Sequence, residues 1–203
     1  MINLNKIYSI ILATLFCSTL STQSFTAIGT VNPAKYIPEQ KMIAFGSNGM
    51  VTTQHYLATK VGEDILNQGG NAYDAAIAIS FTLAVVLPRA GNIGGGGFMV
   101  LHDIKSKKNY AIDYREKAPL LSTTDMYLDE NGTVIPNKST LGYLSSGVPG
   151  TVAGMWAVHQ KFGSMEWEKL LRPAIKLASD GFEISPYMSD MLIKYNAKLS
   201  VFE

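Results

Sequence analysis

A run of glycines between a long apolar segment and a β-rich segment constrains this chain more than any other feature. Gly94–Gly97 are four consecutive glycines, Gly91 precedes them, and the apolar run "FMVLHD" starts at Phe98. Nucleotide phosphate sites need the order strand, glycines, helix, so that a helix N-terminus holds the anion. The order here is helix, glycines, strand, and Phe98-Met99 stand where a P-loop has Lys-Ser/Thr. These differences exclude both nucleotide motifs.

Charge and length narrow the class of protein. The chain has 203 residues, 47% hydrophobic and 16% charged, which is enough for one globular domain with a sizeable core. Seventeen basic and sixteen acidic residues give a formal net charge of +1, with no long run of like charge. We therefore predict no nucleic-acid partner. The three histidines, His55, His102 and His159, lack metal-ligand spacing, so we predict neither a metal site nor a cofactor.

The first 27 residues have the layout of a secretory signal peptide. Lys6 precedes the apolar run Ile7–Leu20, and small polar residues follow it. A single-pass anchor is the alternative, although this run is shorter than the roughly 20 apolar residues that a span requires. Cleavage is expected within Ser21–Ala27, which would remove Cys17, the only cysteine. We predict an exported protein, periplasmic or secreted, with no membrane attachment after signal removal.

The rest of the chain divides into a linker and one folded segment. Residues 28–41 are predicted to be a linker, and residues 42–203 an incomplete domain of α/β class. A strand, a turn and a second strand start are expected over Met42–Gln54. A first helix follows, ended by Gly69–Gly70, with one apolar stripe at Leu57, Val61 and Ile65.

Further elements follow from periodicity and capping residues. Residues 71–87 are apolar nearly all round and predict a buried helix that starts at Asn71 or Asp74. "FMVLHD" and "NYAIDYR" predict a β-hairpin around "IKSKK". Three helices are expected after the hairpin. The first should pack through Val152, Met155, Trp156 and His159. The second should start at the N-cap Ser164, bury Leu170, Ile175 and Leu177, and end at Gly181, and the third should start at Ser185 and Pro186.

The hairpin would bring an arginine to the glycines. A turn centred near Ser106–Lys107 sets Arg115 roughly across from Phe98, at the end of its strand. Alternation places Arg115 on one face with Ala111 and Asp113; Tyr110, Ile112 and Tyr114 lie on the other. A guanidinium binds a carboxylate bidentately, so Arg115 could hold a small carboxylate substrate. A surface ion pair with Asp113 or Glu116 is the alternative, and spacing alone leaves both open.

Three long blocks of sequence resemble one family. They are the stretch from "GMVTTQHYLATK" through "GNIGGGGFMVLHD", then "AIDYREKAP", and then "SSGVPGTVAGMWAVHQKFG". Together they are similar to the N-terminal part of the large subunit of γ-glutamyltransferase (glutathione hydrolase). This resemblance implies part of an αββα sandwich of the N-terminal-nucleophile hydrolase type. It also implies γ-glutamyl substrates such as glutathione, a small subunit as partner, and Arg115 as the ligand of the γ-glutamyl α-carboxylate.

The same resemblance places the nucleophile outside this chain. In the family, the precursor cleaves itself, and the new N-terminal threonine of the small subunit attacks the γ-glutamyl amide. Thr52 and Thr53 lie upstream of Arg115, whereas the family's cleavage site lies beyond Glu203. We therefore predict no catalytic residue in this chain and no turnover by it alone. A truncated inactive remnant, an exported γ-glutamyl-binding protein and a related acylase are the alternatives, and "DYREKAP" favours γ-glutamyl ligands over those of the acylases.

Overall fold

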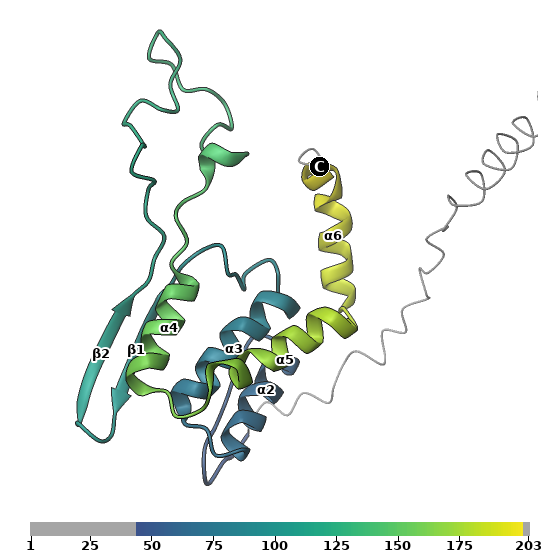
Figure 1. The fold of residues 1–203 in the computed structure, drawn as a ribbon. Coiled ribbons are helices and arrows are strands. Elements are labelled where there is room, and N and C mark those ends of the chain that lie inside the picture. The colour runs from purple at the N-terminus through teal and green to yellow at the C-terminus, as the bar shows by residue number, and fades with distance from the viewer. Residues whose placement is uncertain (1–43, 201–203) are drawn as a thin grey trace, which may run out of the picture. The chain divides into compact units, whose positions relative to one another are not determined.

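The computed structural model describes residues 44–200 (Figure 1). The predicted signal peptide, its cleavage site and the linker 28–41 lie outside these residues. The elements in chain order are α2 (Tyr56–Asn67), α3 (Ala72–Val86), β1 (Phe98–Asp103), β2 (Lys108–Asp113), the 3-10 helix η2 (Tyr143–Ser145), α4 (Thr151–Phe162), α5 (Trp167–Asp180) and α6 (Pro186–Leu199). None of the helices in this described part is long and apolar enough to cross a membrane.

Helices α2 and α3 pack side by side, and their ends are set by local sequence signals. The His55 side chain accepts a hydrogen bond from the Leu57 amide at the start of α2. Asn71 begins α3 in a capping box, in which its side chain accepts from the Asp74 amide while Asp74 accepts from the Asn71 amide. Gly69, between the helices, has φ 90°, as the left-handed helix end predicted for it requires.

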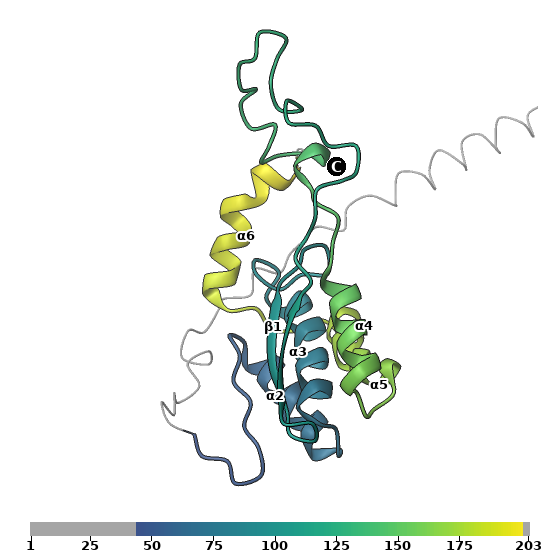
Figure 2. The same cartoon turned by 90° about the vertical axis from the view of Figure 1, so that its left-hand side faces the viewer.

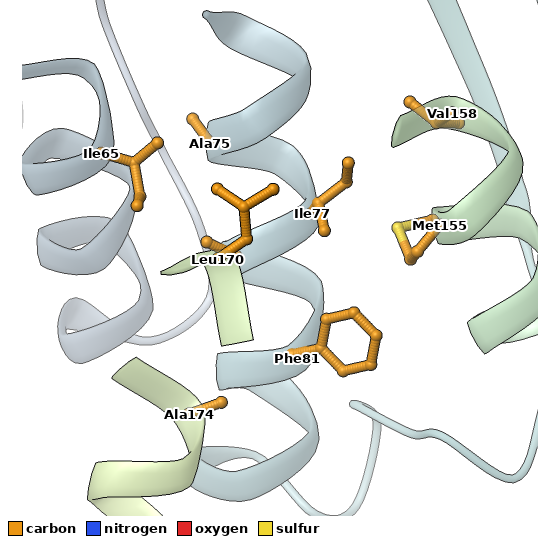
Figure 3. Packing of buried hydrophobic residues seen from close by; sticks show 9 residues of the cluster. Ile65, Ala75, Ile77, Phe81, Met155, Val158, Leu170 and Ala174 are labelled. Carbon is orange, nitrogen blue, oxygen red and sulfur yellow. The ribbon is translucent and has the colours of Figure 1, made fainter. Parts of the chain in front are cut away.

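The core lies around α3, which packs against α2, α4 and α5 (Figure 3). Ile65 of the predicted α2 stripe is fully buried there, whereas Leu57 and Val61 are only half-buried. Figure 3 shows side chains from all four helices pointing toward one another, and the buried cluster comprises Ile65, Ala75, Ile77, Ala78, Phe81, Met155, Val158, Leu170 and Ala174. The predicted burial of the helix at 71–87 is confirmed, because every residue in this range except Ala72 is buried or half-buried.

The hairpin lies against this helical layer with one face only (Figure 2). β1 and β2 form a two-stranded antiparallel sheet in which Phe98 pairs with Asp113 and Asp103 with Lys108. Met99 and Ile112 point inward and pack on the helical core. Val100 on the opposite face is 82% exposed. The mixed α/β class is therefore confirmed, with helices covering one face of the strands.

The two strands expected over 42–54 are absent from the part of this segment that the structure describes. Residues 44–54 contain no strand, although they carry β-branched and apolar side chains. A strand needs a neighbour to satisfy its backbone donors and acceptors. Among residues 44–200 the named sheet contains only β1 and β2, so no pairing partner lies next to this segment.

The buried faces of α4 and α5 differ from the predicted ones. Met155 is buried as expected, but Val152 and Trp156 are 46% and 45% exposed. The buried face of α4 is instead Thr151, Gly154, Met155 and Val158. A Cβ on Gly154 would lie 2.4 Å from the Tyr114 side chain, so the helix turns its glycine toward the hairpin to allow this close packing. In α5, Leu170 is buried as predicted, whereas Ile175 is 59% exposed and Leu177 half-buried.

The sequence suggested Ser164 as the N-cap of α5, and this prediction is wrong. Helix α5 begins at Trp167, and Ser164 instead donates through both its amide and its hydroxyl to the buried carboxylate of Asp74. A carboxylate removed from water requires such donors, and this need outweighs the local preference for a serine cap. The end of α5 at Gly181, with φ 79°, and the Ser185 cap of α6 are confirmed.

Candidate functional site

The glycine loop, Gly91–Gly97, packs closely against the chain's own backbone. A Cβ on Gly96 would lie 2.6 Å from the Tyr114 carbonyl oxygen and 2.5 Å from the Glu116 amide nitrogen. A Cβ on Gly91 would lie 2.1 Å from the Leu83 carbonyl oxygen, at the end of α3. Gly94, by contrast, has open space around it. Glycine is therefore required here because the loop contacts the end of α3 and the continuation of β2.

The start of α4 also packs against the glycine loop and the continuation of β2. The Gly95 carbonyl accepts hydrogen bonds from the Gly150 amide at 2.8 Å and the Thr151 amide at 3.1 Å. A Cβ on Gly150 would lie 2.0 Å from the Tyr114 carbonyl oxygen and 3.2 Å from that of Arg115. The main chain just after β2 therefore packs closely against both the glycine loop and the start of α4.

Arg115 projects from this held backbone, two residues away from its predicted position. The Tyr114 amide donates to the Gly97 carbonyl at 3.0 Å, which continues the hairpin register and places Arg115 beside Gly96 rather than across from Phe98. The turn is centred earlier than expected because the Asp103 carboxylate accepts from the amides at 105 and 106. The predicted proximity of Arg115 to the glycine loop is confirmed.

The predicted alternation of β2 is also confirmed. Ile112 and Tyr114 pack on the core, while Asp113 and Arg115 are exposed on the other face. Burial raises the pKa of the Tyr114 phenol, which stays neutral at physiological pH. Arg115 is thus carried by a strand end whose inward neighbour is anchored in the core.

The Arg115 guanidinium has no charged or hydrogen-bonded partner among residues 44–200. Asp113 accepts a hydrogen bond from the Arg115 main-chain amide at 3.0 Å, so its carboxylate caps the strand end. No ion pair joins Arg115 to Asp113 or Glu116 in the described part of the chain, and the surface-pair alternative is not formed. A guanidinium without a protein partner can bind a carboxylate from a ligand.

Two hollows meet at Arg115. One, of about 290 Å³, lies between the end of β2 and the start of α4 and is lined by Val148, Gly150 and Ala153 among others. The second, of about 380 Å³, lies at the base of the loop 118–147, and its lining is mostly polar and includes Glu116, Lys117, Ser122, Thr123, Tyr127, Ser145 and Ser146. A small ligand at Arg115 could therefore extend its apolar carbons along α4 or its polar groups toward the loop.

The base of the loop 118–147 is fixed by a short backbone bridge. Lys117 and Val148 exchange both main-chain hydrogen bonds, at 3.2 and 2.8 Å. Within the loop, the Tyr127 hydroxyl donates to the Leu144 carbonyl at 2.9 Å. These contacts fix the loop that forms one wall of the second hollow, next to Arg115.

The other polar candidates have structural contacts. The Thr53 hydroxyl donates to the His55 carbonyl at 2.7 Å, at the start of α2. The His102 and His159 rings bond the Asn109 side chain and the Met165 carbonyl, at 2.7 and 2.8 Å. No group of three metal-ligating side chains occurs within residues 44–200. At Arg115 itself, the guanidinium can bind and orient a ligand that carries a carboxylate.

Sequence reasoning missed two residues that build this site, Asn92 and Thr151. The Asn92 side-chain oxygen accepts from the Gly95 amide at 3.0 Å and from the Thr151 hydroxyl at 2.7 Å. An asparagine three residues before a glycine is a common turn signal. Its contact with Thr151, 59 positions away, depends on how α4 packs and leaves no local pattern in the sequence.

Comparison with known proteins gives consistent matches. The model of the family described as gamma-glutamyltranspeptidase matches residues 58–203. The chain is 47% identical over 173 residues to the glutathione hydrolase proenzyme of Pseudomonas sp. (strain A14), and 45% identical over 170 residues to that of Bacillus subtilis (strain 168). These alignments cover 85% and 83% of this chain but 29% of either relative, so the chain spans under a third of their length.

The fold agrees with a solved structure as well. The crystal structure of Helicobacter pylori gamma-glutamyltranspeptidase matches with a TM-score of 0.77 and 47% identity, over 79% of this chain and 46% of that one. This likeness supports the predicted fold, part of the N-terminal-nucleophile hydrolase architecture.

Proposed function

Because this chain belongs to the γ-glutamyltranspeptidase family, we propose that it carries the α-carboxylate site of a γ-glutamyltransferase that hydrolyses glutathione. The observation that supports this role is the Arg115 guanidinium, which has no partner among residues 44–200 and whose backbone packs beside the glycine loop at the junction of two hollows. A γ-glutamyl group has one α-carboxylate for the guanidinium. Its aliphatic carbons fit the hollow beside α4, which is lined by apolar side chains.

The reaction needs a nucleophile that we place in the part of the relatives' length that this chain does not span. A threonine hydroxyl would attack the γ-carbonyl carbon, with its own α-amino group taking the proton. The amide C–N bond breaks, the amine leaves with that proton, and an ester to the glutamyl group remains. Water or the amino group of an amino acid then attacks the ester carbonyl, the ester C–O bond breaks, and the threonine oxygen takes up the proton that the attacking group loses. Arg115 contributes by holding the α-carboxylate, which fixes the distance between the γ-carbonyl and the nucleophile.

Two further parts of the proposal concern context. A small subunit that supplies the nucleophile is the expected protein partner. Export to the periplasm or the medium is proposed from Lys6 and the apolar run Ile7–Leu20. Cell fractionation followed by N-terminal sequencing tests export; a protein that stays in the cytoplasm with Met1 intact would contradict it.

The binding role is tested by replacing Arg115 with glutamine in the monomeric fraction of the 203-residue chain, kept in solution by Val100→Lys on the exposed face of the hairpin. Binding of L-glutamate and of glutathione, followed by NMR titration, should weaken at least tenfold because the bidentate charge-assisted pair is lost. Arg172→Gln is the matched control, since Arg172 is an exposed arginine that pairs with Glu168 on the surface of α5. Equal binding by the wild type and Arg115→Gln would refute the site.

Turnover separates binding from catalysis. We expect the chain alone to release no chromophore from a γ-glutamyl anilide, since no described residue fills the nucleophile's role. Sustained release would show that a nucleophile lies within the 203 residues and would overturn our placement of it.

A further inference from the structure

We propose that Asn92 and Thr151 are positioning residues for Arg115: their side-chain hydrogen bond joins the glycine loop to α4 and so fixes the backbone that carries the guanidinium. The ligand of Arg115 is taken from the proposed function. The positioning itself depends only on contacts within residues 91–151.

The first step is the contact between the two side chains. Thr151 is 4% exposed, and its hydroxyl donates to the Asn92 side-chain oxygen at 2.7 Å. The same oxygen accepts from the Gly95 amide at 3.0 Å. One acceptor atom therefore holds both the glycine loop and the first residue of α4.

This hydrogen bond is not an ordinary helix cap. Thr151 is the first residue of α4, and no side chain caps that helix from its N-cap residue Gly150. The Thr151 hydroxyl reaches across to Asn92, 59 positions away in the chain. The helix's first amides bond the Gly95 carbonyl instead. The interaction thus connects two separate segments rather than finishing one helix.

The second step carries this connection to Arg115. Gly96 and Gly150 both pack against the backbone after β2, each so closely that a Cβ would lie within 2.6 Å of the Tyr114 carbonyl oxygen. Neither glycine has a side chain to hold it there. Their separation is set by the bonds between the segments that carry them, those of Gly95 with α4 and of Asn92 with Thr151. Loosening this link would let the Arg115 backbone shift.

The experiment compares variants that remove or keep the hydrogen bond, all in the monomeric fraction of the 203-residue chain that carries Val100→Lys on the exposed face of the hairpin. Thr151→Val keeps the shape but lacks the donor, and Thr151→Ser restores a donor. Asn92→Ala removes the acceptor at an exposed position, and Asn92→Asp keeps an acceptor oxygen. Amide hydrogen exchange at Tyr114, Gly150 and Thr151 is measured with L-glutamate affinity for each variant, and exchange at Ile77 reports on the core.

We expect Thr151→Val and Asn92→Ala to speed exchange at Tyr114 and Gly150 and to weaken L-glutamate binding about fivefold to tenfold, as the loss of one hydrogen bond predicts. Exchange at Ile77 should stay within about twofold of the wild type, and Thr151→Ser and Asn92→Asp should recover the wild-type values. Unchanged exchange at Tyr114 and Gly150 in Asn92→Ala would overturn the inference.

The readouts separate this inference from the proposed function. If Arg115→Gln binds L-glutamate as well as the wild type, the function fails, while faster exchange in Asn92→Ala still supports positioning. If exchange changes but the affinity of a binding-competent chain does not, the two side chains stabilise the loop without positioning Arg115. That result would also overturn the inference. If Thr151→Val does not fold, Asn92→Ala and Asn92→Asp still decide the matter.

Discussion

At the scale of single residues, the side chains of Asp74 and Arg115 differ in burial and in hydrogen bonding. The Asp74 carboxylate is fully buried and accepts hydrogen bonds from the amides of Asn71, Ser164 and Met165. These donors replace the water that it loses, as a buried charge requires. The Arg115 guanidinium is exposed and lacks a partner among residues 44–200. The satisfied charge joins α3 to the start of α5, and the unsatisfied charge is the one available to a ligand.

His55 is a residue whose protonation should change stability. Its Nδ1 accepts from the Leu57 amide at 3.3 Å, and burial lowers the pKa of the imidazole from the ordinary value of 6.5. The folded state therefore binds fewer protons than the unfolded state near that pH. The contribution of His55 to stability is present above pH 6.5 and is lost as the pH falls through the lowered pKa.

His55→Asn tests this linkage, because asparagine caps helices without titrating. We expect the urea midpoint of the wild type to fall between pH 7.5 and pH 5, and the fall to be smaller in His55→Asn. A slope in His55→Asn as steep as that of the wild type would contradict the assignment.

At the scale of elements, signals carried within one segment were sufficient to predict the helices and the hairpin. The Asn71 cap, Gly69 and Gly181 each lie where their local chemistry placed them. The predictions that were wrong concern features that depend on contacts with other segments of the chain. Among residues 44–200, a strand over 44–54 has no pairing partner next to it, and the phase of the α4 stripe is set by the contact of Gly154 with Tyr114.

One part of the candidate site could be predicted from local sequence signals, and another part could not. The arginine at the end of β2 and its proximity to the glycines follow from hairpin pairing, to within two residues of register. The part that closes the site could not be predicted, because Asn92 and Thr151 meet only after α4 has packed. The Asp103 turn that shifts the register is local, but its effect on Arg115 appears only when both strands are paired.

Two neighbouring glycines give a test of the glycine loop as an element. Gly96→Ala would place a Cβ 2.5 Å from the Glu116 amide nitrogen and must push the loop away from the end of β2. Gly94→Ala adds the same atom in open space. We expect Gly96→Ala to destabilise the folded unit by about 1–3 kcal/mol and to weaken L-glutamate binding, and Gly94→Ala to do neither. Urea denaturation and NMR titration measure both, and similar behaviour of the two variants would count against the close packing of the loop.

At the scale of the molecule, the described unit leaves apolar surface uncovered. Phe98 and Val100 are 63% and 82% exposed on the open face of the hairpin, and Leu120 and Leu121 are almost fully exposed in the loop after β2. Exposed apolar groups of this size are typical of surfaces that another protein segment covers. The chain's coverage of 29% of its relatives agrees with a need for further polypeptide.

We therefore expect the 203-residue chain, produced alone, to aggregate or to fold only in part. Gel filtration should show material larger than a 22.1 kDa monomer. In the monomeric fraction, amide exchange should be slow in the helices around α3 and at the amides that bond the hairpin, the glycine loop and the start of α4 to one another, and fast in the loop 118–147. Val100→Lys, on the open face of the hairpin, should raise the monomer fraction, whereas Lys105→Ala in the hairpin turn should not. A compact, fully protected wild-type monomer would show that the open face is tolerated in water.

The backbone bridge between Lys117 and Val148 has a consequence for how this chain can vary. The peptide between these two residues leaves the unit and returns to the same point, so its length is uncoupled from the position of Arg115. Each doubling of such an excursion adds only about 0.6 kcal/mol of closure entropy. Inserted sequence at the Asn131–Gly132 turn would then be tolerated almost freely, and relatives could alter what approaches the arginine from this side without rebuilding the strand that carries it.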